Sequence, residues 1–277
     1  MDDLRVTLLG TGSPIPDPDR AGPSSLVRSA TTSVLVDAGR GVLMRLAGAG
    51  VAAATLDAVL LTHLHSDHLC DLNDVITTAW VTSMTPRELH VYGPPRTSEV
   101  VDGMVAMLAP DISYRLAHHE DLSAAPNVIV HELEPGDSFE VGDLLVLVGR
   151  TDHRPVEPTV GYRVELAGRS IVLGGDGIPC DSLDELCREA DVYVQTVVRD
   201  DLIRDVPLQR FVDILDYHSS VADAARTAAR AGARKLVLTH QVPAVQPGAE
   251  AEWRELAREH FDGEVVVGDD GLTVEAA

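Results

Sequence analysis

Residues 61–68 read Leu-Thr-His-Leu-His-Ser-Asp-His and close an apolar run that begins at Ala58. Four potential metal ligands therefore lie within six residues: His63, His65, Asp67 and His68. Alternate side chains of an extended chain share a side, so we expect the first three to point one way and the following turn to bring His68 round to them. Imidazoles and a carboxylate are the ligands that Zn²⁺ prefers in open, catalytic sites, which predicts a site able to hold two ions. The alternative is a histidine-rich loop without metal, in which each buried polar group needs its own hydrogen-bond partner.

The spacing of these four residues is similar to the HxHxDH signature of the metallo-β-lactamase superfamily. Further motifs recur in the order found in its ribonuclease Z-like members, which include actinobacterial chains of the ribonuclease Z and arylsulfatase types. These motifs lie at residues 9–14, 151–153, 161–162, 175–176, 218–220 and 236–240. The resemblance runs over nearly the whole chain. It implies an α/β fold, the αββα sandwich, in which two mixed β-sheets are flanked by helices.

The hydrophobic pattern predicts a single domain over residues 1–277, made of two similar halves. Apolar strands at residues 56–61 and 235–238 each lead into a Thr-His pair, Thr62-His63 and Thr239-His240, which favours two halves that meet at one site. Strands are also expected at residues 31–36, within 127–148, at 170–173 and at 191–198. Helices are expected at residues 97–108, ending before Pro110, and at 208–216, 218–231 and 250–259, with a final strand pair around 264–274.

The resemblance implies seven metal ligands shared between two ions. One ion takes His63, His65 and His153, the other takes Asp67, His68 and His240, and Asp176 bridges the two. Zn²⁺ is the expected cofactor, with Mn²⁺ as an alternative. Two such ions lower the pKa of a shared water toward neutrality and polarise the substrate, which indicates hydrolysis.

Two residues are the predicted catalytic groups, Asp67 and His218. Asp67, beside the shared water, can orient it or accept its proton. By resemblance, His218 donates a proton to the leaving oxygen, and an imidazole suits this task because its pKa lies near neutral pH. The residues alone leave another role open for His218, that of a histidine at a helix N-terminus that only binds backbone groups.

The favoured function is cleavage of phosphodiester bonds by a dinuclear zinc hydrolase, which the resemblance extends to processing of tRNA 3′ ends. Two alternatives stay open: an arylsulfatase or lactonase that acts on a small ester, and a non-enzymatic, metal-binding regulatory protein. They rest on two departures from the family pattern. Only 22 residues separate His153 from Asp176, where ribonuclease Z carries a long arm that grips tRNA. Residues 195–198 read Gln-Thr-Val-Val in place of His-Glu-Ala-Thr, whose glutamate orients the acid histidine.

Charge bears on the choice of substrate. The chain has 22 Lys and Arg against 44 Asp and Glu, a formal net charge of −22, and no basic run. Neutralisation of phosphates by Lys and Arg supplies most of the affinity for nucleic acid. The acidic charge and the missing arm therefore make RNA a disfavoured partner and favour a smaller phosphodiester or ester. The resemblance also suggests a homodimer.

Cysteine usage and hydropathy bear on location. The three cysteines form no pair with ligand spacing and no even disulfide framework, as expected in a reducing compartment. No apolar stretch approaches the length that spans a membrane. We therefore expect a cytoplasmic protein without a membrane partner.

Overall fold

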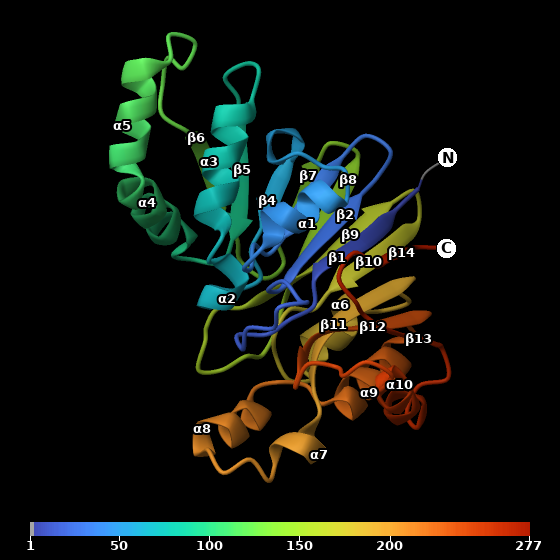
Figure 1. The fold of residues 1–277 in the computed structure, drawn as a ribbon. Coiled ribbons are helices and arrows are strands. Elements are labelled where there is room, and N and C mark those ends of the chain that lie inside the picture. The colour runs from blue at the N-terminus through green and yellow to red at the C-terminus, as the bar shows by residue number, and fades with distance from the viewer. Residues whose placement is uncertain (1–2) are drawn as a thin grey trace.

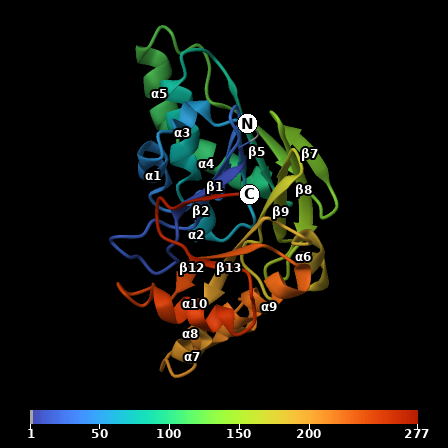
Figure 2. The ribbon, with the colours of Figure 1, turned by 90° about the vertical axis from the view of Figure 1, so that its right-hand side faces the viewer.

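Two seven-stranded β-sheets pack against each other in the computed structural model, which describes residues 3–277 (Figures 1 and 2). The first sheet has the order β14 (Thr273–Glu275), β1 (Arg5–Gly10), β2 (Ser24–Arg28), β3 (Ser33–Val36), β4 (Ala58–Leu60), β5 (Glu88–Gly93) and β6 (Asn127–Glu132). The second has the order β13 (Glu264–Val267), β12 (Lys235–Val242), β11 (Val192–Val198), β10 (Arg169–Leu173), β9 (Val160–Leu166), β8 (Leu144–Arg150) and β7 (Ser138–Val141). Both sheets mix parallel and antiparallel pairs, which confirms the predicted α/β fold.

Helices cover the outer faces of both sheets (Figure 1). Those on the first sheet are α1 (Val42–Gly48), α2 (Ser66–Leu69), α3 (Leu72–Thr82), α4 (Thr97–Met107) and α5 (Ala109–His118). Those on the second are α6 (Asp181–Leu186), α9 (Val221–Ala231) and α10 (Glu250–Arg258). A lobe at residues 200–216 projects at the foot of Figure 1 and contains α7 (Asp200–Ile203), α8 (Gln209–Val212) and the 3-10 helix η2 (Asp213–Asp216). Within residues 3–277, no helix is long and apolar enough to cross a membrane.

The apolar strands are buried on both faces because each sheet lies between the other sheet and a helical layer. In β4, Ala58 and Leu60 face the core between the sheets, while Val59 faces the helices of the first layer. In β12, Val237 faces the central core and Leu236 faces α9 and α10. Burial on both sides explains why these strands read as continuous apolar runs rather than alternating ones.

The predicted helix at residues 97–108 is confirmed within one residue by α4, but the prediction missed the next helix, α5, which has Pro110 in its first turn, where the missing N–H of proline costs nothing. Other predicted boundaries were wrong. The helix expected from residue 218 begins at Val221, because Ser220 is its N-cap and forms a capping box with Asp223. The last two strands do not pair with each other, since β13 joins β12 while β14 joins β1.

Candidate metal centre and active site

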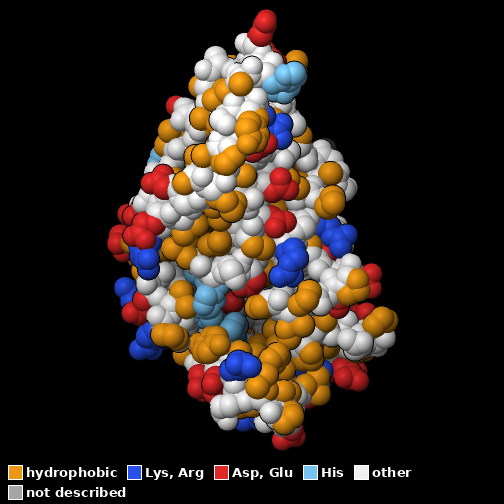
Figure 3. Space-filling view, turned by 60° about the vertical axis from the view of Figure 1, so that its left-hand side comes forward, with side chains coloured by type: hydrophobic (Ala, Val, Ile, Leu, Met, Phe, Trp, Pro, Cys, Tyr) orange, Lys and Arg blue, Asp and Glu red, His pale blue; other side chains and the backbone are white. Residues whose placement is uncertain are grey.

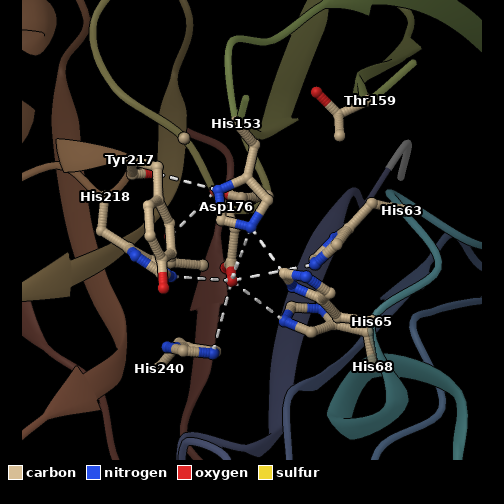
Figure 4. Close-up of polar contacts among 12 residues, drawn as sticks. His63, His65, His68, His153, Thr159, Asp176, Tyr217, His218 and His240 are labelled. Carbon is tan, nitrogen blue, oxygen red and sulfur yellow. Dashed lines mark hydrogen bonds and ion pairs between the residues drawn. The ribbon is translucent and has the colours of Figure 1, made fainter. Parts of the chain in front are cut away.

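The seven candidate ligands converge on one point between the two halves, although they come from distant parts of the sequence (Figure 4). In one group the potential ligand atoms lie within 4.8 Å of one another, and its members are His63, His65, His153 and Asp176. A second group meets the same limit and contains Asp67, His68 and His240. The structure thus brings together every residue in the proposed ligand set, in the same two groups. Figure 3 shows the histidines at the bottom of a hollow that is bordered mainly by hydrophobic side chains.

The motif at residues 61–68 has a different backbone from the one that alternation predicts. Its extended part ends at His65, which is the N-cap of α2, and Asp67 and His68 lie within that helical turn. His63 and His65 do belong to one group, as alternation requires. The expectation that Asp67 points the same way as these two was wrong, because the helical turn carries its carboxylate to the second group.

His240 reaches the centre through an irregularity in its strand. β12 does not end before this residue but continues to Val242, and its pairing with β11 shifts register between Thr196 and Val198. His240 has a φ of 47°, in the left-handed region, while two residues of β12 oppose one of β11. A bulge of this kind re-aims a side chain, and it turns the imidazole into the site.

Asp176 occupies the middle of the cluster. Its Oδ2 lies 3.4 Å from His68 Nε2 and 3.6 Å from His240 Nε2 in the second group, and 3.9 Å from His63 Nε2 in the first. One carboxylate oxygen therefore faces both groups, the geometry that a bridging ligand needs. The turn that presents Asp176 is held from β11, because Gln195 Nε2 and Thr196 Oγ1 each donate to the Gly175 carbonyl at 2.9 Å.

Hydrogen bonds fix the orientation of the imidazoles. His68 Nδ1 donates to Asp37 Oδ2 at 2.8 Å, and His153 Nδ1 donates to the Tyr217 carbonyl at 2.8 Å. The Thr62 hydroxyl donates to Asp37 and so accepts from His63 Nδ1 at 3.0 Å. A protonated Nδ1 leaves the lone pair of Nε2 free, and in all three rings Nε2 faces the centre.

Buried polar atoms without partners mark the centre as a place for a cation. Among residues 3–277, the buried atoms that make no hydrogen bond include His63 Nε2, His68 Nε2 and Asp176 Oδ1. Leaving such atoms unsatisfied is costly, and the two imidazole nitrogens both lie within 4 Å of Asp176 Oδ2, at 3.9 Å and 3.4 Å. His65 Nδ1 and His153 Nε2 also lie only 3.3 Å apart. The donor set of imidazoles and carboxylates fits a divalent metal ion.

Electrostatics favour positive charge at the same point. Burial opposes ionisation of Asp176, but His240 and His68 outweigh it and hold the pKa of this carboxyl well below its usual value. Burial likewise opposes a proton on His68, yet the Asp176 and Asp37 carboxylates raise the pKa of that imidazole well above its usual value. Burial lowers the pKa of His153 to about 4, so this ring stays neutral and able to bind metal.

His218 lies beside the two groups rather than within them. Its Nε2 is 3.2 Å from Asp176 Oδ2, and its Nδ1 donates to the Ile214 carbonyl at 3.0 Å. The backbone contact is the one expected for a histidine before a helix, but Nε2 faces the centre. Thr196, which stands near the position of the family glutamate, bonds to Gly175 and not to His218. A backbone carbonyl therefore orients this imidazole.

Sequence reasoning missed two residues of the site, Asp37 and Tyr217. Asp37 is buried, has a φ of 61° and accepts hydrogen bonds from Thr62 and His68. Its position at the end of β3, directly before Ala38 and Gly39, was the signal available. Tyr217 was detectable only as the neighbour of His218, and its ring lies 5.3 Å from that of His153 and 4.8 Å from that of His218.

Comparisons with known proteins show which proteins the chain is similar to. The family described as Beta-lactamase superfamily domain matches residues 32–241. Ribonuclease Z of Mycobacterium bovis is 54% identical over 274 residues, and that of Mycobacterium marinum is 55% identical, with 98% of each chain covered in both cases. Among solved structures, the metallo-β-lactamase fold protein YhfI from Bacillus subtilis has a TM-score of 0.79 at 25% identity, covering 99% of this chain and 100% of that one. Human tRNase Z, short form, has a TM-score of 0.73 at 25% identity, covering 99% of both chains.

Proposed function

The chain belongs to the β-lactamase superfamily and, within it, to the ribonuclease Z group, and on this premise we propose that it is a dinuclear zinc hydrolase that processes the 3′ ends of tRNA precursors. It is a metal-dependent hydrolase of the kind that acts on phosphodiester bonds. The observation that carries the proposal is the position of Asp176 Oδ2, which faces both groups of candidate ligands and lies 3.2 Å from His218 Nε2.

The expectation that RNA is a disfavoured partner is not borne out. It rested partly on the missing arm, but the alignments cover 98% of relatives that are named ribonuclease Z, so those chains have no room for a long additional arm. It rested also on the net charge of −22, which describes the whole surface and not the hollow. Bound metal ions would make that hollow locally positive and attractive to phosphate.

In the proposal, His63, His65 and His153 would hold one ion, and Asp67, His68 and His240 would hold the other. Asp176, whose Oδ2 faces both groups, would be shared between the two ions. When bound, the two ions lower the pKa of a water toward neutrality and polarise the phosphoryl group. Asp67, whose carboxylate lies in the second group with Oδ2 3.2 Å from His240 Nε2, would accept a proton from the attacking water. His218 gives the proton on Nε2 to the leaving oxygen, while its bond to the Ile214 carbonyl keeps the ring in place.

The two alternative functions are weaker. Membership of a group of hydrolases leaves no support for a non-enzymatic regulatory protein. No contact in the site favours a sulfate ester or a lactone over a phosphodiester, so these substrates serve as comparisons in the assay. We further propose that the chain works as one domain, as a homodimer and in the cytoplasm.

A precursor tRNA with a 3′ trailer tests the proposal. Zinc-loaded protein should cut the trailer off, and Asp67→Asn should slow the cut by about 10²-fold or more because a carboxylate that both binds an ion and accepts the proton is lost. The matched control is Asp102→Asn, at an exposed aspartate of α4, which should cleave at the wild-type rate. Hydrolysis of p-nitrophenyl sulfate or a lactone without cleavage of the precursor would overturn the proposal.

A further inference from the structure

Tyr217 is fixed at the wall of the site by contacts on both sides of its backbone and ring. Its carbonyl accepts a hydrogen bond from His153 Nδ1, and its N–H donates to the Ile214 carbonyl at 3.3 Å. The ring lies edge-on to His153, with an angle of 73° between the planes, and tilted by 45° against His218. These contacts leave the phenol little freedom, so its hydroxyl is held in one place before any substrate arrives.

Within residues 3–277, the hydroxyl of Tyr217 makes no hydrogen bond to another protein group. Figure 4 shows the ring running alongside His218, with its hydroxyl end on the side of the Asp176 carboxylate and no contact drawn from it. The residue is half-buried, so part of it is open to solvent. By contrast, the two tyrosines that are buried in the core, Tyr162 and Tyr193, both donate to a protein acceptor, as buried phenols usually do.

We propose that Tyr217 is a further catalytic residue, whose hydroxyl donates a hydrogen bond to a non-bridging phosphoryl oxygen of the substrate. This inference rests on the proposed phosphodiesterase function. A phenol has a pKa near 10, so it stays protonated at neutral pH and donates without giving up its proton. His218 Nε2 supplies the proton for the leaving oxygen. Tyr217 has a different role, because it stabilises the negative charge that develops on a non-bridging oxygen.

The test is Tyr217→Phe, which removes only the hydroxyl and keeps the ring and the carbonyl that orients His153. Loss of one donor to a developing negative charge should lower kcat by about 10- to 100-fold, with KM changed less than about threefold. The loss should be the same for bis(p-nitrophenyl) phosphate and for a diester with an alkyl leaving group, because a non-bridging oxygen is common to both. The matched control is Tyr114→Phe, at an exposed tyrosine of α5, which should retain the wild-type kcat.

A second measurement does not depend on turnover. Binding of inorganic phosphate to the zinc-loaded protein, followed by calorimetry, should weaken by about threefold or more in Tyr217→Phe, because phosphate offers the same oxygens. Bound zinc should match the wild type in both variants. A wild-type kcat and phosphate affinity in Tyr217→Phe would overturn the inference, as would a loss that grows with the pKa of the leaving group or follows a loss of zinc. If neither wild type nor Tyr114→Phe hydrolyses any diester, the proposed function fails, and the phosphate measurement still decides whether Tyr217 contacts the oxyanion.

Discussion

Asp37→Asn tests how much the orientation of His68 contributes to metal binding, because it changes the hydrogen-bond partner of this ligand and leaves all seven candidate ligands in place. Asp37 touches no candidate metal position but accepts from His68 Nδ1 and from Thr62. Asparagine has nearly the same shape and tolerates the φ of 61° found here, which alanine would not adopt readily. The backbone should therefore persist, and the change is confined to the acceptor.

The size of the expected loss in zinc affinity follows from the number of hydrogen-bond donors that Asp37 accepts from. Oδ1 of Asp37 accepts from the Thr62 N–H at 2.9 Å, while Oδ2 accepts from His68 Nδ1 at 2.8 Å and the Thr62 hydroxyl at 2.9 Å. An amide has one oxygen, so at least one of these buried donors must face its NH₂ group. An unpaired buried donor costs about 1–3 kcal/mol, and loss of a partner that orients a histidine ligand typically weakens metal binding by about 10- to 100-fold.

Competition with a chromophoric chelator measures this effect. We expect Asp37→Asn to weaken zinc binding by about 10- to 100-fold and Asp102→Asn to leave it unchanged. Circular dichroism at high zinc should show the same fold for both variants. Zinc affinity within about twofold of wild type in Asp37→Asn would refute the reasoning that the bond to His68 Nδ1 sets the affinity.

Three further predictions concern the same centre. His218→Ala should lower kcat by about 10²- to 10⁴-fold with zinc content unchanged, and the loss should grow for poorer leaving groups, as pH-rate and leaving-group series can show. Thr196→Val removes one of two donors to the Gly175 carbonyl, so calorimetry should find zinc binding weakened by a few-fold, about the worth of one neutral hydrogen bond. Acidity should also matter, because the pKa values of His68 and His240 are raised by nearby carboxylates. The protons on these two imidazoles stabilise the metal-free fold fully below about pH 6.5, and this stabilisation is lost as the pH rises through the raised pKa values. Zinc binds only the deprotonated imidazoles, so the increase in Tm that zinc causes should grow with pH.

The sequence predicted the parts of the fold that depend on local pattern. The residues that lead to His63 and to His240 are continuous apolar runs, and such runs mark strands that are buried on both faces. Four of the seven candidate ligands could be named because they lie within six residues, and the resemblance to a known family implied the other three. The end of α4 before Pro110 was predicted correctly, but α5 was missed because proline, which breaks a helix interior, is tolerated in a first turn.

The remaining features depend on contacts between distant segments. Asp37 meets His68 because β3 and β4 are neighbours, and only the packed sheet reveals that. The carbonyls of Ile214 and Tyr217 orient His218 and His153, and a backbone acceptor has no signature in the sequence. The bulge at His240 follows from the register of β11 and β12, which the residues of β12 alone do not specify.

The net charge led to the wrong prediction about RNA for a related reason. The net charge of −22 sums over the whole chain, while the hollow is bordered mainly by hydrophobic side chains and contains the histidines (Figure 3). The potential at the reacting atoms depends on the groups at the centre and on any ion they bind, and less on exposed carboxylates that salt screens. Net charge is therefore weak evidence about the substrate of a metal-dependent hydrolase.

The most direct test of the account is to titrate Zn²⁺ into metal-free protein while recording hydrolysis of bis(p-nitrophenyl) phosphate, with bound zinc counted in the same samples by native mass spectrometry. If the two groups each hold an ion and Asp176 bridges them, the rate should reach its maximum only when two ions are bound per chain. A maximum at one ion per chain, or a rate that does not depend on zinc, would contradict the two-ion centre.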